Sequence, residues 1–295
     1  MEKLEILITE RQKDYELIDS GNGQKLERYG DFLLDRPDPQ ALWEKFSPNE
    51  WIKADGVFIR DAQKASWKMK DGTPVEWQIE LAGLHFIISP TAFKHTGVFP
   101  EQSVNWKWIA ESINQVKNIS PERKISVLNL FGYTGGATLA SAKAGADVTH
   151  VDGSKSAIDW AKENAKASGL EQASIRWMLD DVRKFVAREI KRGKRYDGII
   201  LDPPAFGHGA KKELWKIEDH LLELLSMCRQ ILSEDPIFFL LNGYSSGYSA
   251  IAYGNNIKNL MKDFRGTIET GELAIKERAG GRLLPCGIFA RWKKN

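Results

Sequence analysis

The stretch Val127–Gly136, VLNLFGYTGG, constrains the fold of this chain more than any other part of it. Apolar residues up to Leu130 are followed by Gly132, Gly135 and Gly136, and then by the helix-favouring sequence ATLASAKAGA. This order predicts a buried strand, a tight glycine loop and the N-terminus of a helix. Such a junction is typical of folds in which backbone amides meet a nucleotide-like ligand.

Strands and helices alternate through the rest of the C-terminal two-thirds. Each of the apolar segments ISVLNLF, DVTHVDG, SIRWMLD, YDGIILDPP and PIFFLLNG is followed by a segment with helical periodicity. The pattern predicts an α/β, Rossmann-like fold with a mainly parallel sheet and helices on both faces. The final GELAIKERAGGRLLPCGIFARW predicts an antiparallel C-terminal hairpin, which distinguishes this chain from the dehydrogenase type.

The domain organisation predicted from these patterns is a small β-rich domain at residues 1–100 and the α/β domain at residues 101–295. In the first part, Gly-Asn-Gly at 21–23 indicates a turn, and Asp-Gly at 71–72 is a strong hairpin signal. The sequence ALWEKF at 41–46 predicts a short helix. Four tryptophans in this part predict aromatic core packing rather than base stacking.

Size and composition fit one large core with a smaller appended domain, since the chain has 295 residues of which 42% are hydrophobic. No apolar run approaches the ~20 residues that cross a bilayer, and the charged N-terminus is unlike a secretory signal. We therefore expect a cytoplasmic protein without a membrane partner. Cys228 and Cys286 lack metal-ligand spacing, so free thiols and no metal site are predicted.

Acidic residues close the predicted strands at the edge where such sheets bind ligands. Asp152 ends the second strand, Asp180 and Asp181 the third, and Asp202 the fourth. Asp152 is placed to accept both hydroxyls of a nucleoside ribose, and Asp152 or Ser154 can instead cap the next helix. Asp180 or Asp181 can likewise cap a helix or accept the exocyclic amine of an adenine.

The glycine loop discriminates between nucleotide cofactors. A dinucleotide site needs G-x-G-x-x-G so that a pyrophosphate can approach the backbone. Here Phe131 and Tyr133 stand where close-approach glycines would lie. The loop therefore favours a nucleoside ligand with an amino-acid tail, S-adenosylmethionine.

These motifs resemble those of the class I S-adenosylmethionine-dependent methyltransferases. VLNLFGYTGGA, THVDGSKSAIDWAKENAKASG, MLDDVRKF and ILDPPAFG are similar to the group that includes bacterial 23S ribosomal RNA methyltransferases with F-x-Y-T-G and D-P-P-x-F motifs. The resemblance implies a methyltransferase fold, S-adenosylmethionine as cofactor and ribosomal RNA as partner. The cofactor-binding residues so predicted are Asn129, Phe131, Tyr133, Thr134, Gly135, Asp152, Gly153, Ser154, Asp180, Asp181 and Asp202.

The segment Asp202-Pro203-Pro204-Ala205-Phe206 is predicted to face the methyl group. Asp202, Pro203, Pro204 and Phe206 are the catalytic candidates: an Asp side chain and a Pro carbonyl can hold the polar edge of the acceptor, and Phe206 can stack on a flat base. The alternative is that the prolines only end a strand and Phe206 packs in the core. His208 lies between two glycines, which suggest a mobile loop able to close on substrate.

Two further features bear on the substrate. The segment HTGVFPEQ resembles the stretch that precedes the fold in this family, so His95, Thr96 and Gln102 are candidate substrate or cofactor contacts, although a polar linker is equally compatible. Seven Lys and Arg residues between Arg183 and Arg195 can bind phosphates, but a solvated helix face is the favoured interpretation.

The absence of a cysteine nucleophile at the expected position indicates which kind of atom accepts the methyl group. Cytosine-5 members of the resembling group carry a cysteine after the fifth strand, where this chain has Ser245. A base nitrogen is therefore favoured over cytosine C5. The competing hypotheses are a methyltransferase for a small molecule or a protein, and a non-catalytic S-adenosylmethionine-binding module.

Overall fold

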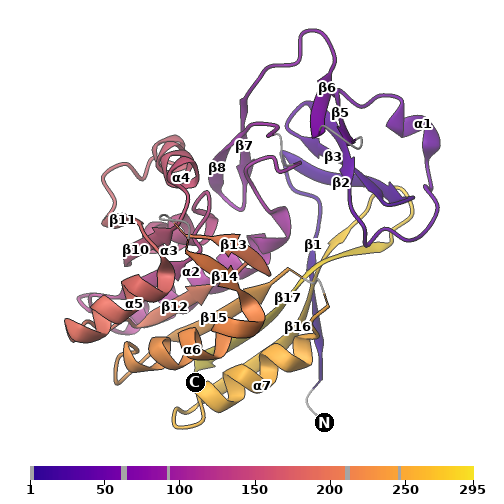
Figure 1. Cartoon of the computed structure of the whole chain (residues 1–295). Coiled ribbons are helices and arrows are strands. Elements are labelled where there is room, and N and C mark those ends of the chain that lie inside the picture. Colours follow the sequence, from indigo (N-terminus) through magenta and orange to yellow (C-terminus); the bar gives the residue numbers. More distant parts are fainter. Residues whose placement is uncertain (1–2, 61–64, 92–93, 210–212, 245–246) are drawn as a thin grey trace. The chain divides into compact units, whose positions relative to one another are not determined.

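The strands of the C-terminal two-thirds, together with one strand from the N-terminus, form an eight-stranded sheet in the computed structural model of the chain (Figure 1). The structure describes residues 3–60, 65–91, 94–209, 213–244 and 247–295. In spatial order the strands are β1 (Glu5–Thr9), β16 (Gly266–Lys276), β17 (Leu283–Lys294), β15 (Phe238–Gly243), β12 (Gly198–Leu201), β9 (Ser126–Leu130), β10 (Asp147–Asp152) and β11 (Ile175–Leu179).

The pairing of these strands confirms the predicted sheet. β9 lies between β10 and β12, and it is parallel to both. β11 and β15 extend the parallel part on its two sides. β17 pairs antiparallel with β15, so the C-terminal strands reverse direction as expected. All four residues of β12 and all six of β15 are buried, as in a parallel sheet covered on both faces.

Helices cover both faces of the sheet (Figure 1). Their bounds are α2 (Ser103–Ile119), α3 (Gly136–Lys143), α4 (Lys155–Ala167), α5 (Val182–Lys191), α6 (Ile217–Gln230) and α7 (Ala250–Leu260). Because side chains alternate along a strand, Val127 packs with α2 and α3 on one face, and Leu128 packs with α5, α6 and α7 on the other. None of the described helices is long and apolar enough to cross a membrane.

The chain divides into two compact units with discontinuous boundaries. The larger unit comprises Met1–Leu7, Val104–Glu272 and Gly287–Asn295, and the smaller comprises Ile8–Ser103 and Leu273–Cys286. These boundaries differ from a single division at residue 100. The first strand, β1, joins the central sheet next to β16. The end of the C-terminal hairpin bonds instead to β2, through Arg278 N to Leu17 O at 2.9 Å.

The smaller unit is built from β-strands. A five-stranded sheet holds, in order, β2 (Tyr15–Gly21), β3 (Gln24–Tyr29), β4 (Phe32–Pro37), β5 (Gly56–Arg60) and β6 (Ala65–Met69), and a separate hairpin holds β7 (Trp77–Leu81) and β8 (Leu84–Ile88). The predicted Gly-Asn-Gly turn joins β2 to β3. Asn22 and Gly23 have φ of 54° and 71°, the left-handed values that such hairpin turns need.

Two local predictions in this unit are wrong. Asp71 and Gly72 form a turn, but β6 pairs with β5 and β7 with β8, so the turn does not join a hairpin. Pro74 lies two residues after Gly72 and has no N–H to donate to a ladder. Residues 41–46 are not helical, because the carbonyls of Ala41 and Trp43 accept N–H bonds from the β2–β3 turn. The helix here is α1 (Pro48–Trp51).

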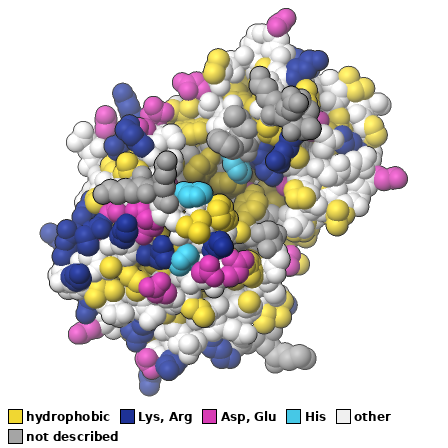
Figure 2. Space-filling model, viewed as in Figure 1, with side chains coloured by type: hydrophobic (Ala, Val, Ile, Leu, Met, Phe, Trp, Pro, Cys, Tyr) yellow, Lys and Arg dark blue, Asp and Glu magenta, His cyan; other side chains and the backbone are white. Residues whose placement is uncertain are grey.

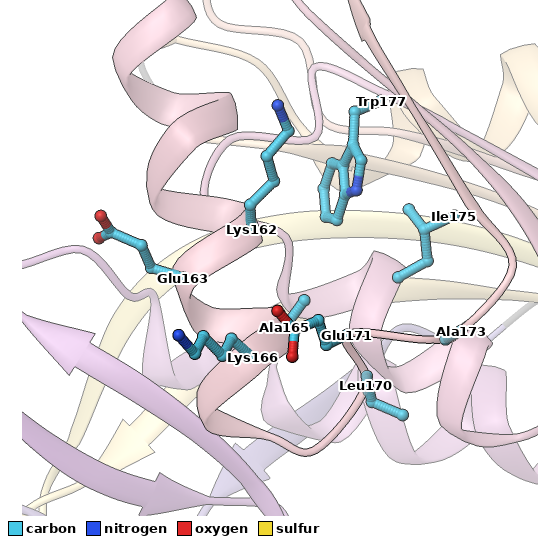
Figure 3. Close-up of a pocket in the computed structure, with 9 residues that line it drawn as sticks. All are labelled: Lys162, Glu163, Ala165, Lys166, Leu170, Glu171, Ala173, Ile175 and Trp177. Atoms are coloured by element: carbon cyan, nitrogen blue, oxygen red, sulfur yellow. The ribbon is translucent and has the colours of Figure 1, made fainter.

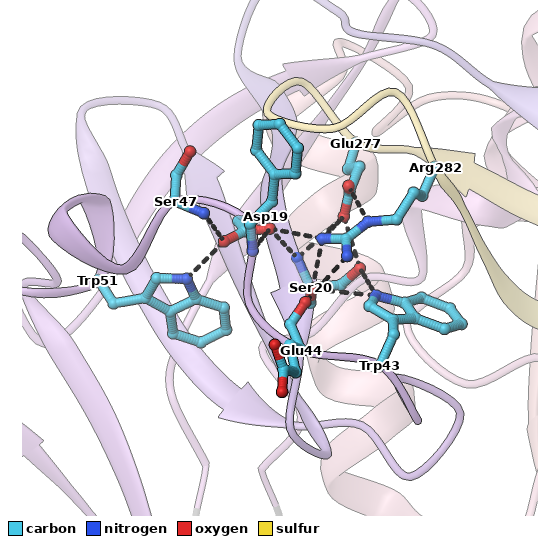
Figure 4. Close-up of polar contacts among 9 residues, drawn as sticks. Asp19, Ser20, Trp43, Glu44, Ser47, Trp51, Glu277 and Arg282 are labelled. Carbon is cyan, nitrogen blue, oxygen red and sulfur yellow. Dashed lines mark hydrogen bonds and ion pairs between the residues drawn. The ribbon is translucent and has the colours of Figure 1, made fainter.

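A buried ionic network fixes the end of the C-terminal hairpin within the smaller unit (Figure 4). Asp19 and Glu277 are 0% and 2% exposed, and both carboxylates contact the Arg282 guanidinium. Arg282 Nη2 donates to Asp19 Oδ1 at 2.9 Å. The second oxygen of Asp19 accepts from Trp51 Nε1 at 2.8 Å, and Ser20 Oγ donates to Glu277 Oε2 at 2.7 Å. One guanidinium therefore compensates two buried carboxylates.

Replacing Arg282 with Met leaves those two carboxylates buried without their cation. We expect Arg282→Met to lower the free energy of unfolding by about 3 kcal/mol. The matched control is Lys276→Met, because Lys276 pairs at 3.3 Å with Glu10 at an exposed position. That change should cost less than about 1 kcal/mol. Urea unfolding followed by tryptophan fluorescence measures both, and equal losses would contradict the role given to Arg282.

Candidate functional site

The carboxyl ends of the central parallel strands lie in register at one edge of the sheet. Leu130 of β9 is paired with Leu201 of β12, and the ladder continues through Asp202 N to Leu130 O at 3.4 Å. On the other side, Asp180 N donates to Asp152 O at 3.0 Å. The acidic residues predicted at three strand ends are therefore brought to the same edge, as the parallel arrangement requires.

The loop after β9 has an unusual backbone. Phe131 and Tyr133 have φ of 58° and 47°, in the left-handed region that bulky side chains rarely adopt. Each such residue costs on the order of 1–3 kcal/mol unless its surroundings hold it. Two contacts do so: Asp152 Oδ2 accepts from Tyr133 N at 2.9 Å, and Asn164 Nδ2 donates to Thr134 O at 2.9 Å.

Two glycines of this loop leave room for aromatic side chains from other elements of the protein. A Cβ on Gly132 would lie 2.4 Å from the His150 ring, and one on Gly136 would lie 2.2 Å from the Trp106 ring. Gly135, with φ of 92°, precedes α3 and gives that helix no side-chain cap. These glycines thus allow close internal contacts, which agrees with a loop that is not a pyrophosphate cradle.

Asn129 belongs to a buried chain of hydrogen bonds beneath this loop. It is 3% exposed, and its Nδ2 donates to Thr138 Oγ1 at 2.9 Å. Thr138 Oγ1 lies 2.9 Å from His150 Nδ1. Burial lowers the pKa of His150 to about 3, so the ring is neutral near pH 7. Sequence reasoning missed Thr138 and His150; a histidine inside the apolar strand DVTHVD was the available signal.

Asp152 joins the loop to the next helix. Besides Tyr133 N, its carboxylate accepts from Ser154 N at 2.7 Å. Ser154 caps α4 by accepting from Ala157 N at 3.3 Å, so Asp152 is not that cap. Burial raises the pKa of Asp152, while the N–H groups of Ser154, Tyr133 and Gly153 oppose the shift. The carboxylate thus stands half-buried at the strand end.

Asp180 and Asp181 are both engaged within the larger unit. Asp181 is 6% exposed and caps α5, its Oδ1 accepting from Lys184 N at 3.0 Å. Asp180 forms an ion pair with Arg188 and accepts from Asp181 N at 3.0 Å. The hydrogen bond from Lys184 N therefore shows that Asp181 acts as the N-cap of α5.

The chain that follows Asp202 forms a hairpin at the end of β12. β13 (Phe206–His208) pairs antiparallel with β14 (Leu214–Lys216), which is a strand rather than the start of α6. Phe206 is 57% exposed, so it is not a core residue. The His208 ring lies 5.4 Å from the Phe206 ring at 88°. His208 therefore belongs to a strand, where the sequence predicted a mobile loop.

Trp215 anchors this hairpin, and sequence reasoning missed it by placing it in a helix. The indole is 3% exposed, and its Nε1 donates to Pro204 O at 2.7 Å. Its ring centroid lies 4.9 Å from that of Phe131. Pro203 is buried and Pro204 exposed. Trp215 thus contacts both the loop after β9 and the segment after β12.

The remaining candidates belong to other elements or lie outside the described residues. His95, Thr96 and Gln102 belong to the smaller unit, where burial lowers the pKa of His95 to about 4. Cys228 in α6 and Cys286 in β17 are buried, and burial raises the pKa of both thiols. Neither is a ready nucleophile. Ser245 lies outside the described residues.

Lys and Arg side chains gather over α5 (Figure 2), but several are already paired. Lys184 pairs with Glu213 at 2.8 Å, and Arg192 pairs with Glu189 at 2.8 Å. A separate groove of ≈ 360 Å³ lies between α4 and β11 (Figure 3), with Trp177 on one wall and Lys162 and Lys166 on the other. The groove also carries Glu163 and Glu171, so its charge is balanced.

Comparison with known proteins identifies the family. A family model described as S-adenosylmethionine-dependent methyltransferase matches residues 57–236. Ribosomal RNA large subunit methyltransferase K/L of Shewanella amazonensis is 30% identical over 228 residues, covering 73% of this chain and 28% of that protein. Ribosomal RNA large subunit methyltransferase I of Aeromonas salmonicida is 33% identical over 129 residues, covering 43% and 30%. The chain thus spans about a quarter to a third of these curated relatives.

Solved structures agree with this assignment. The S-adenosylmethionine-dependent methyltransferase from Agrobacterium tumefaciens has a TM-score of 0.93 and 43% identity, covering 98% of this chain and 93% of that one. A methyltransferase complexed with SAH, SMU.776, shares the fold with a TM-score of 0.70 and 19% identity, covering 95% and 76%. Family model, relatives and fold together show that this chain belongs to the S-adenosylmethionine-dependent methyltransferases.

Proposed function

We propose that this methyltransferase modifies a base of ribosomal RNA, with a ring or amino nitrogen as the acceptor. The observation that carries the proposal is Phe206, a 57% exposed aromatic side chain four residues after Asp202 at the ligand edge of the sheet. An exposed aromatic face beside a carboxylate suits a planar base with a polar edge. The names of the ribosomal RNA methyltransferases to which the chain is similar support the same substrate class.

The side chains at this edge fit S-adenosylmethionine. The side chains available to hold the cofactor are acidic: Asp152, Asp180 and Asp202 stand at the ends of successive strands. Carboxylates accept from ribose hydroxyls and attract a sulfonium cation, whereas they repel a pyrophosphate. We assign the ribose to Asp152, the adenine to Asp181 with Asp180 beside it, and the methionine part to the loop. The residues we assign to it are Phe131, Tyr133, Thr134 and Gly135 of the loop and Asn129 of β9 beneath it, with Gly153 and Ser154 completing the Asp152 turn.

Methyl transfer to a nitrogen requires the protein mainly to position the methyl donor and the acceptor. Bound S-adenosylmethionine would supply an electrophilic methyl group: the acceptor nitrogen would bond to the methyl carbon in line as the carbon–sulfur bond breaks, S-adenosylhomocysteine would leave, and the proton of the acceptor's N–H would pass to Asp202 or to solvent. Asp202 accepts a hydrogen bond from the acceptor's N–H, which aims the nitrogen lone pair at the methyl carbon. Phe206 holds the plane of the base. Positioning of this kind accounts for most of the acceleration in such displacements.

The burial of both cysteines favours a nitrogen over cytosine C5 as the methyl acceptor. Methylation at C5 needs a thiolate that adds to the ring. Cys228 and Cys286 are both buried, and burial raises the pKa of each thiol, which disfavours the thiolate. A nitrogen acceptor needs no such nucleophile.

We assign recognition of the RNA to the β-rich part at residues 1–100, with His95 and Gln102 as candidate contacts and His208 as a further one on the hairpin. Thr96 is 0% exposed, so it does not reach an RNA in this structure. Consistent with a ribosomal substrate, we propose that the protein acts in the cytoplasm. An electrostatic contribution from RNA phosphates would make binding weaken as salt rises.

The ribose assignment is tested at Asp152. Asp152→Asn keeps the shape but removes the charge, and a lost hydrogen bond to a charged acceptor is worth about 1.5–3 kcal/mol. We expect the dissociation constant for S-adenosylmethionine to rise roughly 10- to 100-fold. Isothermal calorimetry measures it. Asp159→Asn, on the exposed face of α4, is the control, and equal affinities for the two variants would refute the assignment.

The substrate is tested with radiolabelled S-adenosylmethionine. Total RNA, protein and metabolite fractions are incubated separately with the enzyme, and the label should appear in ribosomal RNA. Phe206→Ala should lower this labelling by roughly 5- to 100-fold, as expected for a lost base stack of about 1–3 kcal/mol, without changing cofactor affinity. Leu214→Ala, at 43% exposure on the paired strand, is the control. Label in protein or metabolites instead of RNA would overturn the proposal.

A further inference from the structure

We propose that Trp215 is a positioning residue that sets the distance between the methyl-donor loop and the acceptor segment. The inference rests on the proposed function for its RNA assay and on the family assignment for the rest. Trp215 contacts both segments: the Pro204 carbonyl on one side and the Phe131 ring on the other. The Trp215 side chain is 3% exposed, so both contacts are shielded from solvent.

The contact with the acceptor segment is a short hydrogen bond. Trp215 Nε1 donates to Pro204 O at 2.7 Å, near the lower end of normal N–H···O distances. An indole N–H is a donor only, so this bond also fixes the orientation of the ring. One of the two lone pairs of the Pro204 carbonyl is consequently engaged by the protein.

The contact with the donor loop is a ring pair. The Trp215 and Phe131 centroids are 4.9 Å apart with an interplanar angle of 60°, an edge-to-face geometry. Phe131 is one of the two loop residues with left-handed φ. A residue in a disfavoured conformation needs its side chain to be held, and Trp215 supplies that restraint from a strand outside the loop.

The hairpin transmits the position of Trp215 to Phe206. Trp215 stands opposite Gly207 in the β13–β14 pairing, next to the Phe206–Lys216 pair. Ile217 N also donates to Ala205 O at 3.0 Å, which continues the pairing. The ring is buried in the apolar core with Val182 and Phe185 of α5. Trp215 therefore ties the proposed base-stacking side chain and the loop to one rigid anchor.

Trp215→Phe tests this role because it keeps an aromatic ring but removes the donor to Pro204. We expect the single-turnover rate of methyl transfer to RNA to fall roughly tenfold, since a small misplacement of reacting groups is costly. The dissociation constant for S-adenosylmethionine, measured by calorimetry, should stay close to that of the unsubstituted protein. The loss should appear in kcat rather than in KM for the cofactor.

The control is Trp292→Phe, the same substitution at a 1% exposed residue of the same apolar core. Trp292 pairs with Phe239, near the amino end of β15 and away from the ligand edge. A general loss of packing would lower thermal stability and the methyl-transfer rate to a similar extent in both variants, whereas the positioning role predicts a rate loss only in Trp215→Phe. Equal rate losses in the two variants would overturn the positioning role.

A second measurement does not depend on activity or on how the variants fold. In the unsubstituted protein labelled with ¹⁵N-tryptophan, the Trp215 indole N–H should exchange with solvent far more slowly than an exposed indole. Rapid exchange would mean that the bond to Pro204 is absent and would overturn the inference. If the wild-type enzyme labels no RNA, the proposed substrate is wrong, while slow indole exchange still supports the anchor. If it labels RNA and Trp215→Phe labels it equally fast, the inference is wrong.

Discussion

The parallel ladder around β9 is the constraint on which the rest of this structure depends. Because Leu130 pairs with both Val151 and Leu201, the residues that follow three separate strands meet at one edge. Parallel hydrogen bonds are evenly spaced, so a shift of any strand would move its terminal residue away from the others. The site is therefore built by backbone pairing first. Side-chain chemistry acts on positions that the ladder has already aligned.

The loop after β9 is stable because groups from other elements hold it. Its left-handed residues Phe131 and Tyr133 are unfavourable on their own. The Asp152 carboxylate binds the Tyr133 N–H, Asn164 holds the Thr134 carbonyl, and Gly132 admits the His150 ring. Backbone strain is thus concentrated where a ligand is expected. The surrounding hydrogen bonds and packing offset its cost.

Sequence patterns anticipated the larger unit better than the smaller one. The buried strands GIIL and FFLLNG are continuous apolar runs that end at polar residues, so their place and direction were predictable. In the smaller unit, the predicted helix at 41–46 is absent because its carbonyls accept bonds from the β2–β3 turn. The Asp71–Gly72 turn formed as predicted, but it joins strands of two different sheets. Local propensity was overridden there by pairing with distant residues.

By itself the sequence determined the fold class, the methyl-donor cofactor and the strand ends that carry acidic residues, because these depend on periodicity and on short contiguous motifs. Only the tertiary structure decided which groups are already occupied. Asp181 caps α5, Pro204 O accepts from Trp215, and Arg282 compensates two carboxylates, one of them on β2. The sequence left the Asp181 cap as one of two alternatives, and the roles of Trp215 and Arg282 arise from contacts between separate segments that packing brings together, which no local sequence pattern encodes.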